Sequence, residues 1–320
     1  MMSFLAVALV LFATSAAAQT YPSRPITIIA PTTAGGPPDT IARLLSEPMR
    51  AVLGQPIVVE NVTGAGSTLG VGRVARAAPD GYTLSIGHLN SHVFSSLTYP
   101  VAYDVVKDFE PISLIGIAPM LLFGRIGLPG ADLKAFVAWL KANPGKASFG
   151  TVGVGGPARV WATDFQSNIG TRFQFVPYRG AFAIVQDIVG GQIDIGYAEG
   201  SNILSHLRGG KLKAYAVASD TRWPAAPDVP TIVEAGVPGL QMPFWHGIWA
   251  PKGTPPDVIA KLNAAVTHAL ADPTVRARLT QMGQEIFPRE QQTPQALAAH
   301  HKAEVEKWGA VIKATGVKAE

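Results

Sequence analysis

Short apolar stretches alternate with helix-like stripes of apolar residues along most of the chain after residue 20. Runs of four to six mostly apolar residues predict buried strands, and apolar residues spaced three or four apart predict helices with one buried face. Strands are expected at 26–30, 57–60, 82–87, 147–151, 173–178, 193–197 and 214–219, and helices at 40–53, 69–77, 133–140, 157–169, 183–189, 256–271, 273–281 and 294–313. This alternation predicts an α/β protein with mainly parallel sheets and helices on both faces.

The first residues follow a different pattern. Residues 3–13 are apolar, and Ala16-Ala17-Ala18 follows them as a small-residue cleavage site. Residues 1–18 are therefore expected to be a secretory signal peptide that directs the protein to the periplasm. No Lys or Arg precedes the apolar core, so a buried N-terminal helix is the alternative. No later segment is long and apolar enough to span a membrane, and we expect a soluble mature protein.

Length and charge narrow the class of protein. The chain has 320 residues, a net charge of +4 and no cysteine. That length is sufficient for two lobes. Lys and Arg are scattered rather than gathered into a patch, which argues against nucleic-acid binding. The absence of cysteine excludes disulfides, thiolate metal sites and a cysteine nucleophile.

Two Gly-Gly-Pro loops are the strongest candidates for chemistry. Gly35-Gly36-Pro37 and Gly155-Gly156-Pro157 each precede a predicted helix. The first N–H groups of a helix lack partners, and the helix dipole favours negative charge there, so such a loop suits a carboxylate or phosphate. The alternative is that each loop is only a turn. Asp39 is also placed to cap these N–H groups itself, which would leave fewer for a ligand.

Other motifs argue against catalysis. The spacing of Gly64, Gly66 and Gly70 misses the dinucleotide-binding fingerprint by one residue. The chain contains neither G-x-S-x-G nor H-E-x-x-H. We expect no catalytic residue, no metal site and no cofactor.

Ordered motifs over nearly the whole chain carry a resemblance to a known family. They are Tyr21-Pro22, Ala34-Gly35-Gly36-Pro37, Leu53-Gly54-Gln55-Pro56, Pro79-Asp80-Gly81-Tyr82, Val176-Pro177-Tyr178-Arg179-Gly180, Gly190-Gly191-Gln192-Ile193-Asp194 and Pro227-Asp228-Val229-Pro230. With these motifs the chain resembles the Bug-type extracytoplasmic solute-binding proteins, the receptors associated with tripartite tricarboxylate transporters.

The resemblance implies a two-lobed fold of the periplasmic-binding-protein type (type II, Venus-flytrap). Lobe 1 would combine residues 21–122 with 245–320, lobe 2 would be residues 123–244, and a ligand cleft would lie between them. The protein would capture a small organic anion by hinge closure and deliver it to the permease subunits of a tripartite transporter. A di- or tricarboxylate is the first choice of ligand and an aromatic carboxylate the second. We expect a monomer.

The resemblance also implies ligand-binding positions. In lobe 1 they are Thr32, Thr33, Ala34, Gly35, Gly36, Asp39, Gly66, Ser67, Asn90 and Ser91; in lobe 2 they are Val154, Gly155, Gly156, Arg159, Tyr178 and Ala198.

Four of these positions depart from the family pattern, and one of them is Gly156, which replaces a common serine. Thr32 replaces a frequent aromatic residue, and Arg159 replaces a common histidine. Ala198 replaces an aspartate that pairs with amino groups, which argues against an amino-acid ligand. Arg159 is expected either to clamp a second carboxylate or to be a surface arginine. Two alternatives to a transport receptor remain open: a ligand sensor for a membrane regulator, and an enzyme on the same frame.

Overall fold

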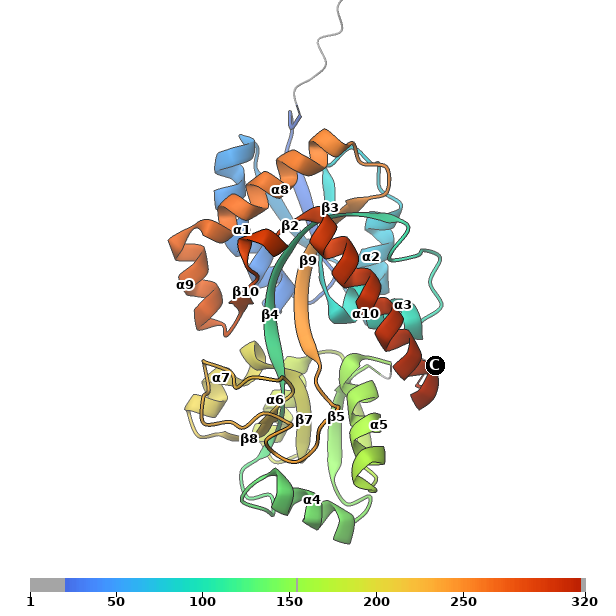
Figure 1. Ribbon diagram of the computed structural model, residues 1–320, viewed down its shortest axis with the longest axis vertical. Helices are drawn as coiled ribbons and strands as arrows, with labels where there is room; N and C mark the ends of the chain where they lie inside the picture. The colour runs from blue at the N-terminus through green and yellow to red at the C-terminus, as the bar shows by residue number, and fades with distance from the viewer. Residues whose placement is uncertain (1–20, 154, 318–320) are drawn as a thin grey trace, which may run out of the picture.

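One long strand, β4 (Phe109–Arg125), runs through both lobes of the protein (Figure 1). In the computed structural model, which describes residues 21–153 and 155–317, its first part pairs antiparallel with β9 (Pro243–Pro251), as far as Pro119 opposite Pro243. From Met120 onward the same strand pairs with β7 (Ile195–Glu199) and β8 (Leu212–Val217). The predicted signal peptide and Val154 lie outside the described residues.

The upper lobe in Figure 1 is built on a parallel core of three strands. Adjacent side chains of its central strand enter cores on opposite faces: Ile28 packs in the cluster of Ile41 and Leu262, and Ile29 packs in the cluster of Val71 and Leu297. The parallel strands are β1 (Ile26–Ala30), β2 (Ile57–Asn61) and β3 (Thr83–His88), and the helices are α1 (Pro37–Leu53), α2 (Thr68–Ala75), α8 (Pro256–Ala271), α9 (Pro273–Gln281) and α10 (Pro294–Thr315).

The lower lobe repeats this arrangement. Phe149 packs with Trp161 and Phe165 on one face of the sheet, and Phe123 packs with Ile184 and Ile203 on the other. The parallel strands are β5 (Ser148–Val152), β6 (Gln174–Tyr178) and β7, and the helices are α4 (Leu133–Ala142), α5 (Pro157–Ile169), α6 (Ala181–Val189) and α7 (Gly200–Arg208).

The predicted two-lobed α/β fold is confirmed, and the predicted strands and helices lie within a few residues of their expected positions. The sheet is mixed rather than mainly parallel, because β4 runs antiparallel to β7, β8 and β9. Sequence reasoning missed β4, β9 and α7. No helix among the described residues has the length and apolar character needed to cross a membrane.

Candidate functional site

The carboxyl ends of the parallel strands in the two lobes face each other. Asn90, just after β3, and Gly156, before α5, meet across this boundary: the Asn90 Oδ1 atom lies 3.6 Å from where a Cβ on Gly156 would be. The Tyr99 hydroxyl lies 3.3 Å from the same position on Gly153. Ligands of open α/β sheets bind at such strand ends, so the loops here form the candidate site.

The first loop joins β1 to α1. The Gly35 N–H donates to Asp39 Oδ2 at 2.8 Å, and the Gly36 N–H donates to the Thr33 carbonyl at 3.1 Å. Pro37 and Pro38, the first residues of α1, have no N–H. Most donors expected from this loop are thus already engaged, and Asp39 acts as the internal cap that its position suggested. Thr33 and Ala34 form the exposed tip of the loop.

A chain of polar side chains that begins at the buried Asp39 holds this loop in place. Asp39 is only 3% exposed and accepts a 2.9 Å bond from Arg43 Nε, while Arg43 Nη2 donates to Asn61 Oδ1. Asn61 in turn donates to the Thr32 carbonyl at 3.2 Å. Burial alone would raise the pKa of Asp39, but the hydrogen bonds from Arg43 and Gly35 outweigh it and hold that pKa below its usual value. Asp39 therefore positions the loop as a carboxylate.

The second loop of the upper lobe, Ala65–Ser67, has an unusual backbone. Ala65 and Ser67 both have positive φ, at 43° and 88°. The Gly66 carbonyl accepts a hydrogen bond from the Ser95 hydroxyl, which ties the loop to the segment after β3. Non-glycine residues with positive φ cost energy and cluster at functional sites.

Ser91 lies inside the upper lobe. It is 0% exposed. Its hydroxyl accepts from the His88 N–H at 3.0 Å and lies 2.9 Å from His92 Nδ1. The contacts of this side chain are therefore with the turn after β3.

The loop between β5 and α5 presents more available donors. Its start is held by the Gly153 N–H, which donates to the Tyr178 carbonyl, and by the Thr151 hydroxyl, which donates to the Gly153 carbonyl. Within the described ranges, the N–H groups of Gly155 and Gly156 make no hydrogen bond to the backbone. They precede α5, where the helix dipole favours an anion.

Arg159 lies in the first turn of α5, beside these donors. Its guanidinium stacks on Phe175 of β6, with Cζ 3.6 Å from the ring centroid. Burial lowers its pKa, and none of the described carboxylates lies within ion-pair distance. Arg159 is thus a partly desolvated cation without a counter-charge of its own.

At two other predicted positions, the side chains contact residues within the lower lobe. The Tyr178 hydroxyl donates to Asp187 at 2.6 Å, and burial together with that carboxylate raises its pKa to about 12. Ala198 is 4% exposed and packs in the core beside Leu121. The structure therefore brings together Asn90, Gly66 and Gly156, but not the side chains of Ser91, Tyr178 and Ala198.

A buried polar group at the hinge was missed by sequence reasoning. Glu199, at the end of β7, accepts a 2.5 Å bond from Gln284 Nε2, and its Oε2 lies 3.8 Å from His246 Nε2. Burial raises the pKa of Glu199 to about 8, against the opposing hydrogen bonds from Ser201 and Gln284, and burial lowers the pKa of His246 well below its usual value. Both groups are therefore neutral near pH 7.

A second hinge contact lies beside this pair. The Trp223 indole N–H donates to the Gly283 carbonyl at 2.9 Å. A segment that leads from α9 to β10 (Glu285–Ile286) thus joins the lobes through both Gly283 and Gln284.

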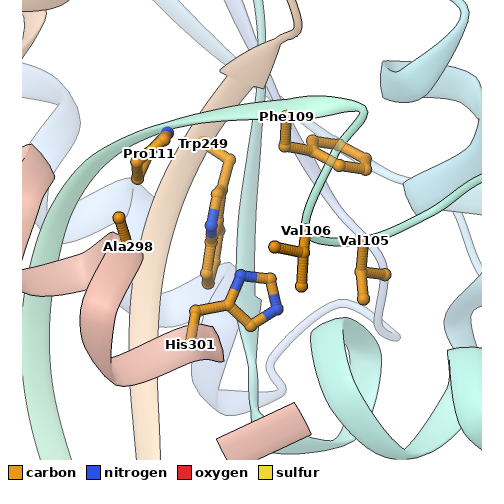
Figure 2. Close-up of a pocket in the computed structure, with 7 residues that line it drawn as sticks. All are labelled: Val105, Val106, Phe109, Pro111, Trp249, Ala298 and His301. Atoms are coloured by element: carbon orange, nitrogen blue, oxygen red, sulfur yellow. The ribbon is translucent and has the colours of Figure 1, made fainter. Parts of the chain in front are cut away.

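Two cavities lie away from the facing loops. One, of about 390 Å³, lies where β4 and β9 cross between the lobes and is lined by Pro119, Trp223 and Pro243 among others. The other, of about 40 Å³, is lined by Val106, Phe109, Trp249 and His301 among others (Figure 2). Neither is lined by a predicted ligand-binding residue. No group of three or more His, Asp and Glu residues in the described part of the chain is arranged to hold a metal ion.

Comparison with known proteins gives one consistent result. The family described as "Tripartite tricarboxylate transporter family receptor" matches residues 41–317. MatC of Rhodopseudomonas palustris, solved with bound malate, is 40% identical; the match covers 91% of this chain and 100% of MatC, with a TM-score of 0.85. The periplasmic binding protein BugD is 38% identical over 94% of this chain and 100% of its own, with a TM-score of 0.86. R. palustris Rpa4515, solved with adipate, is 29% identical over 93% and 99%, with a TM-score of 0.86.

Proposed function

This chain belongs to the tripartite tricarboxylate transporter receptor family, which confirms the resemblance seen in its motifs, and we propose that its solute is a small organic carboxylate. As a member it is a solute-binding receptor. The observation that carries the ligand class is the position of Arg159 in the first turn of α5, directly after the Gly155 and Gly156 N–H groups, with a guanidinium that has no carboxylate partner among the described residues. Backbone donors at a helix start and a desolvated arginine are complementary to a carboxylate.

The binding step is closure of the two lobes on the ligand. One carboxylate meets the Gly155–Gly156 loop, and the remainder of the ligand reaches Thr33, Ala34 and the Asn90 amide in the upper lobe. A shift from about 1:99 to about 99:1 in favour of the closed form requires about 5.5 kcal/mol of preferential binding to that form. The closed receptor then delivers the ligand to the permease subunits of the transporter. This role requires no catalytic step.

The lobe boundaries expected from the sequence remain our proposal. Lobe 1 comprises residues 21–122 and 245–320, and lobe 2 comprises residues 123–244. The exchange of β4 partners between Pro119 and Met120 supports these limits, since it lies within three residues of position 122.

Dicarboxylates are the first candidates, because relatives were solved with malate and adipate. Tricarboxylates share the same chemistry, and aromatic carboxylates come second. Members of the family such as BugD are periplasmic binding proteins, and we place this receptor in the periplasm as a monomer, exported by residues 1–18.

A thermal-shift screen tests the proposal. Protein that begins near Gln19, refolded from denaturant to remove any bound ligand, is mixed with di- and tricarboxylates, aromatic acids, amino acids and neutral sugars. A ligand at about a hundred times its Kd adds about 2.7 kcal/mol to the free energy of unfolding, which raises Tm by several degrees. Stabilisation by carboxylates alone supports the proposal. Stabilisation by sugars or amino acids alone would refute it.

A further inference from the structure

We propose that Tyr99 limits the length of the bound ligand and donates a hydrogen bond to it, an inference that rests on the proposed carboxylate-binding function. Tyr99 follows the short helix α3 (Ser95–Thr98) of the upper lobe. It was not among the positions that the sequence indicated.

The ring lies between the two lobes. A Cβ on Gly66 would lie 2.5 Å from Tyr99 Cε2, so the ring packs directly on the backbone of the Ala65–Ser67 loop. Its hydroxyl lies 3.3 Å from the same position on Gly153, which belongs to the lower lobe. One side chain therefore contacts both facing loops and occupies space between them.

The two glycines allow this contact. Gly66 and Gly153 have positive φ, at 63° and 66°, a conformation that favours glycine, and neither has a side chain to displace the ring. The Ser95 hydroxyl, at the start of the helix that Tyr99 follows, donates to the Gly66 carbonyl. The ring and the Ala65–Ser67 loop are thus positioned as one unit.

The hydroxyl remains available to a ligand. Tyr99 is half-buried, and its hydroxyl makes no hydrogen bond with any described residue, since the Gly153 N–H and carbonyl are already paired with Tyr178 and Thr151. A phenol O–H is a suitable donor to a carboxylate oxygen. The ring excludes a longer chain, and the hydroxyl binds the end of a shorter one.

Equilibrium binding of succinate, glutarate, adipate and pimelate, which differ only in chain length, tests this role. The wild-type protein should bind succinate more tightly than pimelate. Tyr99→Ala should shift the ratio of the two Kd values toward pimelate by about tenfold or more, as expected when a pocket gains room for methylenes. Tyr99→Phe should keep the ratio and weaken all four ligands by about three- to tenfold, because it removes only the donor.

Tyr103→Phe is the matched control. The Tyr103 ring packs against Gly72 and Phe109 within the upper lobe, so this variant should bind as the wild type does. If the wild-type protein binds the four acids and folded Tyr99→Ala has the same ratio of succinate to pimelate Kd values, the proposed role of Tyr99 is overturned but the proposed carboxylate-binding function is not. Wild-type protein that binds none of the four acids overturns the proposed dicarboxylate function and this inference together.

Discussion

The side-chain amide of Gln284 donates a 2.5 Å hydrogen bond to the carboxyl group of Glu199 across the boundary between the lobes. Glu199 is 4% exposed, and the groups that face it are Gln284, Ser201 and the neutral ring of His246. Among residues 21–153 and 155–317, no cation compensates a negative charge at this position. The contact therefore joins the lobes through a carboxyl group that burial keeps protonated.

This relationship predicts how stability depends on pH. The pKa of Glu199 is about 8 in the folded protein, against the ordinary value of 4.5 that applies in the unfolded chain. Between these two pH values, unfolding therefore releases a proton. Higher pH then favours unfolding, and the stabilisation is lost as pH rises from about 4.5 to about 8. Each unit of pKa difference corresponds to about 1.4 kcal/mol. Urea titrations across this window should show a steeper decline for the wild type than for Glu199→Gln. Parallel profiles would show that Glu199 is ionised in the folded state.

Gly283 predicts a second hinge effect. A Cβ there would lie 1.9 Å from Cζ2 of the Trp223 ring, and the φ angle of Gly283 is +77°. Gly283→Ala should lower the free energy of unfolding by about 2 kcal/mol or more, because steric overlap adds to backbone strain. Gly236→Ala is the control, since Gly236 has a φ of +86° with open space around it. Gly236→Ala should lower the free energy of unfolding by about 1 kcal/mol. Equal losses for the two variants in urea titrations would mean that the Trp223 ring moves aside without cost.

The local pattern of residues was sufficient for the elements but not for their long-range pairing. Ile28 and Ile29 mark a strand because both side chains are buried in an apolar run. Residues 112–118 and 120–123 are also mostly apolar runs, but Pro111 and Pro119 interrupt the segment, and the residues that pair with these prolines lie more than a hundred positions away in β9. The pattern therefore did not indicate one continuous strand. The lobe crossing therefore depended on the family resemblance.

The same limit applies to the site. The cap by Asp39 was foreseen because it acts on Gly35, four residues away. The bond between Glu199 and Gln284 spans 85 residues, and Tyr99 meets Gly153 only through the packing of the two lobes. Contacts of this kind arise from the tertiary arrangement, which no local spacing encodes.

Gly35 tests whether the first loop faces the ligand. A Cβ on Gly35 would meet no atom within 4 Å, and its φ is +80°. Gly54, at the end of α1, shares both properties with a φ of +71°. Alanine at either position should cost about 1 kcal/mol of stability. Only Gly35→Ala should weaken carboxylate binding, by about tenfold or more, because its methyl group enters the space opposite the lower lobe. Calorimetric titration of both variants measures this, and equal affinities would place the first loop outside the site.

Substitution of Arg159 tests whether the site binds one carboxylate of the ligand or two. Its guanidinium is oriented by Phe175 and lacks a carboxylate partner among the described residues, so a second ligand carboxylate would complete the pair. Arg159→Ala should weaken dicarboxylates by about 1.5–3 kcal/mol, the usual worth of a charge-assisted hydrogen bond, and monocarboxylates much less. Arg159→Lys should fall between, because lysine keeps the charge but not the planar pair of donors. Arg172→Ala removes the same charge from an exposed position beyond the far end of α5 and should leave Kd unchanged. Equal losses for mono- and dicarboxylates in Arg159→Ala would assign Arg159 to packing on Phe175 rather than to ligand binding.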